Sequence, residues 1–485
     1  MRKKEKALFL LAVIFTTFLL NACQKNPDTA AVVSKNDGSF DANAAISASE
    51  HHDPDTTVPI AYTRDFTSTN GSVEFRIRLD EIVTGADMPI VEVQPHYITE
   101  TEAKRIAQAL FGNAELYEKD SLKSRAEIQQ CIMRWTPYAN RNAMQELLPP
   151  SSESSVDFWV RMFQNSIEAY TKSYESAPEE NPHAPCQWTF HKDSYYSLPV
   201  DNTNPETYRE NDSIQATTQV NGIPYHFWVS IRQENDYKLS FAMAYPQEFI
   251  VGDKAIYTAQ LCRTEKPSAS QMEGIRKQAE SMLEQMAVGE WLVDECYLET
   301  TEREEYIVHV DAVPKLNGVP AMRVPQLSNL NSDKIYASSY YITNVSFRFS
   351  PQGDLLYFEM QSPIDVSKII NDNVAVMDMP ELLERVEQAM SLSDIYEFDF
   401  DSIVEMYQEQ SIDLGCLVEI HSLDHNLIRV KKPNTEEEYY YIPGIVVTGD
   451  IEYYSKATGD AICKMTQARL LALNAVDGSV ININQ

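Results

Sequence analysis

The sequence predicts an α+β fold of two or three modules, each an antiparallel sheet with packed helices, after a signal peptide and a flexible tether. Segments with apolar residues at helical spacing are interspersed with segments in which apolar and polar residues alternate. The order helix, strand, Asn-Gly-x-Pro turn and hairpin occurs twice, around Asn221 and Asn317, which indicates a divergent duplication. We therefore expect a signal peptide at 1–22, a lipidated cysteine and tether at 23–57, and modules at 58–264, 268–375 and 376–485.

The N-terminal segment has the features of a lipoprotein signal peptide. Four basic residues within positions 2–6 precede 14 uncharged residues, Ala7–Leu20. This apolar run is shorter than the about 20 residues that a membrane-spanning helix needs. Leu20-Asn21-Ala22-Cys23 resembles a bacterial lipobox. The resemblance implies cleavage before Cys23 and attachment of a diacylglycerol to that cysteine. An ordinary secretory signal and an uncleaved membrane anchor are the alternatives.

Residues 24–57 are predicted to be a flexible tether that holds the body of the protein off the membrane. They are dominated by Ala, Ser, Asn, Asp and Thr and contain almost no aromatic residue. Such a segment cannot bury enough apolar surface to offset its chain entropy. His51-His52-Asp53 lies within it, and we expect no metal site there because adjacent histidines in a flexible run have no fixed geometry.

The first module begins with a strand and a capped helix. Apolar and polar residues alternate over 72–79, which predicts a half-buried strand. Thr99 and Glu102 predict a capping box for the next helix, and Gly112 its end. Helical patterns follow at 121–133 and, with an aromatic stripe, at 156–174. The turn at 221–224 leads into a hairpin of 225–231 with 237–245.

The second and third modules repeat this pattern more loosely. Ser270 and Glu273 predict a second capping box, with the helix ending near Gly289. A strand at 306–310 and a hairpin over 340–360 follow, and Pro380 favours the start of a helix over 382–390. We expect 417–421 and 427–431 to pair as a hairpin. The remaining strands are expected at 439–447, 450–454, 465–473 and 479–483, with a tight turn at Asp477-Gly478.

Charge and composition exclude some classes of ligand. The chain has 485 residues, 43% of them hydrophobic, and a formal net charge of −32 at pH 7. Residues 1–22 carry four basic side chains and one acidic side chain, so removing them leaves −35. A body this acidic repels nucleic acid and anionic lipid headgroups. Solubility at the cell surface explains the charge, and a basic partner or loose binding of divalent cations are the alternatives.

The sequence contains no motif for catalysis, a cofactor or a metal. Zincin, nucleophile-elbow, P-loop and dinucleotide-binding motifs are absent, so we expect no catalytic residue, no cofactor and no metal. The six cysteines other than Cys23 show no zinc spacing, and we favour free thiols over disulfides. Adjacent tyrosines at 195–196, 340–341, 439–441 and 453–454 could stack on sugars. On a strand, however, one ring of each pair should face the core and the other should face outward.

Two short segments resemble known repeat units. Asn474-Ala475-Val476-Asp477-Gly478-Ser479-Val480-Ile481 resembles the end of a PepSY-type unit, and Thr99-Glu100-Thr101-Glu102-Ala103 with Ile106-Ala107 resembles the start of its helix. Tandem units of this kind build the extracytoplasmic regulators of the YycH and YycI kind, which hold a sensor kinase in check. The whole chain also resembles an uncharacterised family of large lipoproteins from Gram-positive bacteria.

These features predict an extracytoplasmic lipoprotein on the cell membrane that acts by non-covalent binding, in a regulatory or accessory role. Its partners would be the outer leaflet of the cytoplasmic membrane, through Cys23, and another envelope protein, contacted through 380–485, where one ring of Tyr439–Tyr441 should face outward. The alternatives are a cell-wall polysaccharide or solute binder and, third, a hydrolase. A regulator should expose a sheet edge or an apolar patch, and a sugar binder should show a groove ringed by aromatic side chains.

Overall fold

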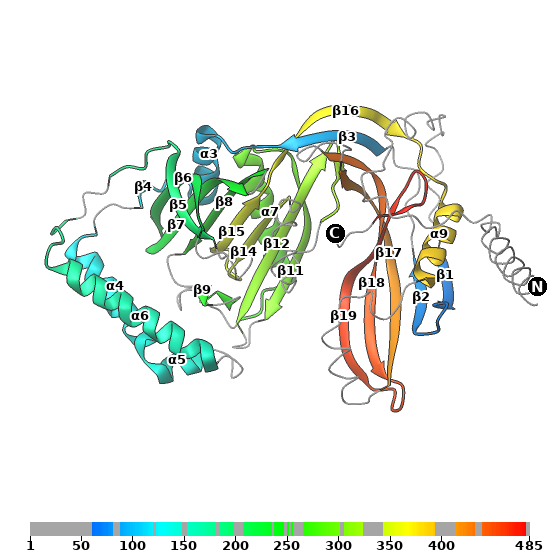
Figure 1. Cartoon of the computed structure of the whole chain (residues 1–485), viewed down its shortest axis with the longest axis horizontal. Coiled ribbons are helices and arrows are strands. Elements are labelled where there is room, and N and C mark those ends of the chain that lie inside the picture. Colours follow the sequence, from blue (N-terminus) through cyan, green and yellow to red (C-terminus); the bar gives the residue numbers. More distant parts are fainter. Residues whose placement is uncertain are drawn as a thin grey trace, which may run out of the picture.

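The computed structural model confirms the α+β prediction and shows two large sheets joined by a two-stranded ribbon (Figure 1). The predicted signal peptide and tether, with Cys23 and His51-His52, lie outside the described residues. None of the helices in the described part of the chain has the length and apolar character needed to span a membrane. The described residues are 61–80, 88–119, 123–147, 153–180, 184–197, 207–234, 237–246, 250–251, 254–255, 265–300, 305–323, 343–392, 413–431 and 439–481.

The ten-stranded sheet is built from two similar halves. In the first, α3 (Glu100–Phe111) precedes β4 (Leu116–Glu118), β6 (Thr207–Val220), β7 (Ile223–Glu234) and β8 (Tyr237–Pro246). In the second, α7 (Ala269–Met286) precedes β11 (Trp291–Thr300), β12 (Tyr306–Leu316), β14 (Asn344–Phe349) and β15 (Leu355–Gln361). The strand order β11-β12-β14-β15-β8-β7-β6-β4 places β15 beside β8 at the centre. The predicted first and second modules therefore share one sheet.

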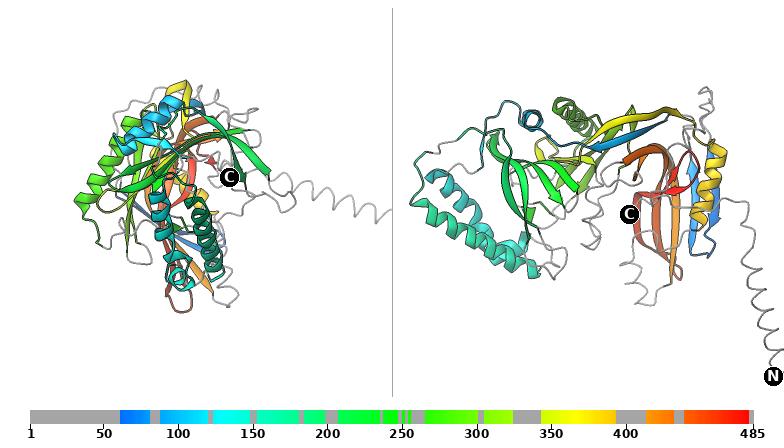
Figure 2. Two further views of the ribbon diagram at one scale, coloured as in Figure 1. Left: turned by 90° about the vertical axis from the view of Figure 1, so that its left-hand side faces the viewer. Right: turned by 45° about the horizontal axis from the view of Figure 1, so that its top comes forward.

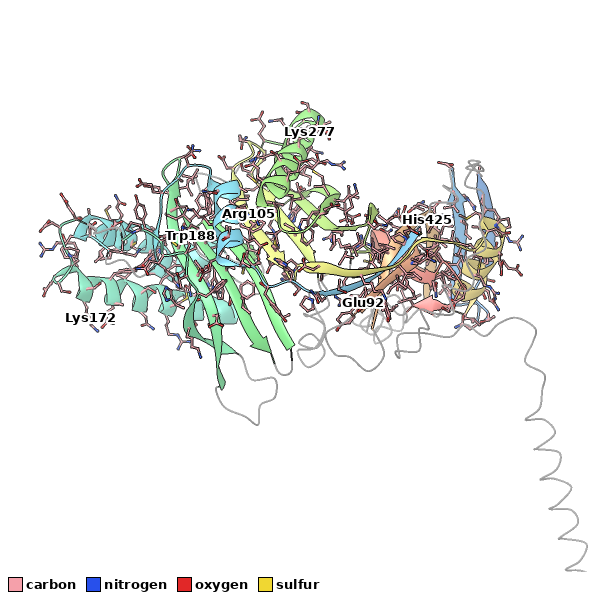
Figure 3. All side chains as sticks on the ribbon, turned by 90° about the horizontal axis from the view of Figure 1, so that it is seen from above. Glu92, Arg105, Lys172, Trp188, Lys277 and His425 are labelled. Atoms are coloured by element: carbon pink, nitrogen blue, oxygen red, sulfur yellow. The ribbon has the colours of Figure 1, made fainter. Side chains whose placement is uncertain are left out.

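One apolar core holds both halves together. Both helices lie on the same side of the sheet, as the positions of Arg105 on α3 and Lys277 on α7 show in Figure 3. The sheet contributes fully buried aromatic side chains such as Phe227 on β7 and Phe347 on β14. Because each helix covers only part of this face, the two halves complete a single core.

The two Asn-Gly turns occupy equivalent positions and support the predicted duplication. One connects β6 to β7, and the other connects β12 to the short strand β13 (Val319–Pro320). Asn221, Gly222, Asn317 and Gly318 all have positive φ, between 49° and 87°. Hairpins of two residues favour Asn-Gly because both central positions need positive φ.

A helical insertion separates β4 from the rest of the first half. It comprises α4 (Arg125–Trp135), η1 (Pro137–Ala139), α5 (Arg141–Leu147) and α6 (Glu153–Tyr174), and it projects from one end of the molecule (Figures 1 and 2). The predicted aromatic stripe packs in a small core of its own, in which the rings of Trp135 and Tyr170 have centroids 5.0 Å apart. The short β5 (His191–Ser197) then pairs with β6, and β9 (Ile250–Val251) with β10 (Lys254–Ala255).

The eight-stranded sheet joins the N-terminal strands to the C-terminal part of the chain. β1 (Tyr62–Thr67), β2 (Val73–Leu79), β17 (Leu414–Lys431), β18 (Tyr439–Ser455), β19 (Ala461–Asn474) and β20 (Val480–Ile481) follow one another in this sheet. The pairing of β2 with β17 is parallel. The alternating apolar residues of β2 pack with the apolar face of α9 (Met379–Ser391). The sheets thus divide the chain differently from the predicted segments 58–264, 268–375 and 376–485.

The prediction that 417–421 and 427–431 form a hairpin is wrong. Both segments belong to the single strand β17, which pairs with β18 along its whole length. The polar residues between them resemble a turn, but they remain in the ladder: Asp424 lies opposite Val446, and a bulge at Ile420–Ser422 absorbs the irregularity. Likewise, 439–447 and 450–454 are one strand, β18, with Gly449 inside it.

The second capping box lies two residues before its predicted position. Ser268 caps α7, and the Gln271 side chain accepts a hydrogen bond from the Ser268 backbone N–H at 2.9 Å. The helix ends at Met286 and is followed by Ala287 in the left-handed conformation, before Gly289. The first box is confirmed at Thr99 and Glu102, as is the glycine at position 112 that ends α3.

Candidate functional site

The junction between the two sheets is the candidate functional site. The chain leaves the eight-stranded sheet through β3 (Met88–Pro95) and returns to it through β16 (Ile364–Val374). These strands pair with each other to form the ribbon, in which Glu92 is labelled in Figure 3. The end of β3 also pairs with β18, Val93 lying opposite Tyr439. The two strands that connect the sheets, β3 and β16, therefore run side by side.

The outer strand of the ribbon, β16, presents an edge that pairs with no strand in the described part of the chain. Val366 and Ile369 lie on it with 41% and 48% of their surface exposed. They lie opposite Val93 and Val91, which are buried. A bulge between Val366 and Lys368 explains why both apolar side chains share a face although they are three positions apart. The apolar face of β3 thus continues, uncovered, onto β16.

A histidine joins the ribbon to the ten-stranded sheet. His96 lies between β3 and α3, and its side chain is 17% exposed. Its Nδ1 lies 2.9 Å from Oδ2 of Asp365 on β16, and its Nε2 lies 3.0 Å from Oε2 of Glu102 on α3. Glu102 also accepts the capping hydrogen bonds from Thr99. The imidazole of His96 therefore links β16 of the ribbon to α3 of the ten-stranded sheet.

The pKa values of this cluster favour its charged form. Burial by itself lowers the pKa of His96, but hydrogen bonds and charge attraction from Asp365 and Glu102 raise it overall above 6.5. Burial by itself raises the pKa of Glu102, but its hydrogen bonds with Thr99 and His96 lower it overall. Both shifts describe an imidazolium between carboxylates.

The cavity beside His96 is small. Its volume is about 10 Å³, which is space for about one water molecule. It is lined on one side by the ribbon and on the other by Arg429 and Tyr439, whose ring centroid lies 4.6 Å from the guanidinium carbon. A cavity of this size cannot enclose an organic substrate.

A second set of polar contacts crosses between the sheets. Arg323 binds Asp311 of β12, with Nη2 and Oδ2 2.6 Å apart, and also pairs with Glu295 of β11. Arg469 of β19, in the other sheet, reaches Asp294 of β11 at 3.1 Å and Glu295 at 3.5 Å. Burial raises the pKa of Asp294. This network, with Asp294, Glu295, Asp311, Arg323 and Arg469, connects the two sheets away from the ribbon.

The tyrosine prediction is only partly confirmed. Tyr439 and Tyr441 are 4% exposed, while Tyr440 between them is half-buried, so the expected alternation occurs. The outward ring is not free, because Tyr440 packs against a second apolar cluster on the other face of the sheet. Tyr454 is likewise half-buried and donates a hydrogen bond to Glu74 at 2.9 Å. Tyr340–Tyr341 and the side chains of Tyr195–Tyr196 lie outside the described residues.

The cysteines in the described part of the chain form no disulfide with one another. The five described cysteines, Cys131, Cys186, Cys296, Cys416 and Cys463, are free thiols. In the described ranges, no group of three His, Cys, Asp or Glu side chains could hold a metal ion. The cluster around His96 was missed in the sequence. Glu102 was visible there only as a capping residue, and no local pattern connects it with Asp365.

Comparison with known proteins finds similarity to solved structures, but not to a protein family or a curated protein. No protein-family model matches the chain, and no curated protein matches it. Among solved structures, the chain aligns with the crystal structure of an uncharacterized protein from Eubacterium rectale. The alignment covers 91% of this chain and 99% of that protein's chain, with 10% sequence identity and a TM-score of 0.39.

Proposed function

We propose that the chain is a lipid-anchored extracytoplasmic protein that binds another envelope protein. We place the contact on the outer edge of its ribbon, β16, in place of the segment 380–485 expected from the sequence. The lipobox ending at Cys23 supports the anchor. The observation that carries the binding proposal is the uncovered pair Val366 and Ile369 on β16. These two β-branched side chains extend a buried apolar face into solvent and so offer a partner an apolar surface to cover.

The chemistry of this edge specifies the partner. Exposed Asp365 and Asp372 flank the apolar pair, and Lys368 is the basic side chain between them. The whole chain carries a net charge of −32, so an acidic partner would be repelled. Bulges and a lysine restrict continuous strand addition along an edge. We therefore infer a partner segment that places apolar side chains on Val366 and Ile369 and basic side chains beside the flanking aspartates.

Changing the apolar pair should weaken binding and leave the fold intact. In the double variant Val366→Asp and Ile369→Asp, affinity for the partner should fall at least tenfold, about 1.4 kcal/mol, because two charges would be desolvated at the contact. Stability should change by no more than about 0.5 kcal/mol, because both side chains are exposed. Leu392→Asp, at another exposed apolar residue, 57% exposed, is the matched control.

The partner can be captured with a photo-crosslinker at Ser367, which is exposed between the two apolar residues. On intact cells, the lipidated chain should crosslink to one envelope protein, and the double aspartate variant should not. That protein, once purified, should bind the soluble body more weakly as salt rises. Adducts with a second copy alone would indicate self-association instead. Direct binding of cell-wall polysaccharide without any protein adduct would favour the polysaccharide-binding alternative.

The lipid anchor has its own test. Cells that express the wild type should incorporate labelled fatty acid into the protein, and Cys23→Ser should lose the label and release the protein from the membrane, because the acylated thiol is missing. Metabolic labelling followed by membrane fractionation measures both effects. A serine variant that keeps the label and stays in the membrane fraction would contradict the lipoprotein proposal.

A further inference from the structure

We propose that His96 is a pH-sensitive latch that locks the ribbon to the ten-stranded sheet while both of its ring nitrogens carry protons. The contacts of the latch lie within one chain, although Asp365 also flanks the apolar pair of the proposed binding edge. Asp365 stands on the returning strand and Glu102 on the first helix of the ten-stranded sheet. In addition, the His96 backbone N–H donates to the carbonyl oxygen of Pro363 at 2.8 Å.

A carboxylate within hydrogen-bond distance of each ring nitrogen favours the charged imidazole here. Ionised carboxylates only accept hydrogen bonds, so each ring nitrogen of His96 must donate one. A neutral imidazole has one N–H, and its other nitrogen would then present a lone pair to a carboxylate oxygen about 3 Å away. Loss of the proton therefore replaces one attractive contact with a repulsive one and frees either Asp365 or Glu102.

Three further titratable groups lie near the His96 cluster, and they come from α3, β17 and β18. Arg105 of α3 lies 3.4 Å from the second oxygen of Glu102 and shares its charge. Arg429 of β17 and Tyr439 of β18 line the same cavity as His96, and Arg429 lies over the Tyr439 ring. Burial lowers the pKa of His96, but the hydrogen bonds and charges of Asp365 and Glu102, which lie against the ring, together outweigh it and raise this pKa above its ordinary value.

The raised pKa of His96 sets the sign of the pH dependence. A histidine whose pKa is raised on folding stabilises the fold fully below its unfolded pKa, about 6.5. That contribution is lost as pH rises through the folded pKa, above 6.5. The latch should thus be closed in mildly acidic conditions and open in alkaline ones. When it opens, the ribbon end of the junction should become less fixed. The ion pair of Arg469, the hydrogen bond from the Met322 backbone N–H to the Leu427 carbonyl oxygen at 2.8 Å and the apolar cluster around Leu427 remain as contacts between the sheets.

Distances between spin labels on the two sheets test the latch. We would place labels through unnatural amino acids at Glu284 on α7 and at Ala457 after β18, which leaves the native cysteines in place. The wild type should give a narrow distance distribution at pH 6 and a broader one at pH 9. His96→Gln should be broad at both. His421→Gln is the matched control, because His421 faces a single carboxylate, Asp450 at 3.6 Å, within one sheet.

Two further variants separate the latch from a general loss of folding. Glu102→Gln keeps an N3 residue suited to the capping box, and Asp365→Asn changes a half-exposed side chain. In both, the pKa of His96, measured by NMR with labelled histidine, should fall toward 6.5, and the distance distribution should broaden at a lower pH than in the wild type. A wild-type distribution that stays equally narrow from pH 6 to pH 9, or a His96 that titrates at or below 6.5, would overturn the proposal.

Discussion

Replacing Asp311 by alanine is expected to lower the free energy of unfolding by about 3 kcal/mol, the lower end of the cost of breaking a buried ion pair. The Asp311 side chain is only 4% exposed and accepts a hydrogen bond from Ser346 at 2.7 Å in addition to its pair with Arg323. Its loss leaves Arg323, itself 14% exposed, with Glu295 as the acid that still contacts its guanidinium. A buried charge that loses its buried partner is costly even with the more exposed Glu295 still in contact, whereas the intact pair contributes little net stability.

Two related variants should change stability less than Asp311→Ala. Asp311→Leu combined with Arg323→Met should recover at least half of the loss, because it removes both buried charges together. Lys277→Ala, which breaks an exposed pair with Glu273 on α7, should change stability by less than about 0.5 kcal/mol. Urea unfolding followed by tryptophan fluorescence measures all three. If Asp311→Ala were as stable as the wild type, the network would not be a structural connection.

Replacing Gly449 by alanine is expected to cost about 2–3 kcal/mol through overpacking. Gly449 lies on β18 between β17 and β19, opposite Ile420 and Ala468. A Cβ there would overlap the backbone carbonyl oxygen of Glu419 and would lie 2.9 Å from a methyl group of Leu470. The carbonyl belongs to the strand ladder and cannot rotate away, so the pairing of β17 with β18 must shift.

Gly274 is the matched control for this substitution. It lies within α7, and a Cβ added to it would meet no other atom within 4 Å. Gly274→Ala should therefore stabilise the protein by about 0.5–1 kcal/mol, because alanine loses less backbone freedom in a helix. In thermal unfolding, the melting temperature of Gly449→Ala should fall and that of Gly274→Ala should rise. A Gly449→Ala protein that melts at the wild-type temperature would mean that the strands can separate locally without cost.

The local elements were largely determined by the sequence. The alternation of Val73, Phe75, Ile77 and Leu79 specified β2 and its buried face, and the Thr99–Glu102 box specified the start of α3. The two Asn-Gly turns marked the repeat. These signals act over a few residues, through side-chain periodicity, capping hydrogen bonds and permitted backbone angles, so a single segment contains them.

The pairing of these elements was decided only by the tertiary structure. β2 has no local reason to pair in parallel with β17, more than 300 positions later, and the polar segment around Asp424 looked like a turn until β18 was seen to continue its ladder. The candidate site has the same origin. His96 and Glu102 are close in sequence, but Asp365 meets them only because β16 returns beside β3. Long-range pairing depends on the sum of buried surface and backbone hydrogen bonds over whole strands, and no single stretch of sequence carries that sum.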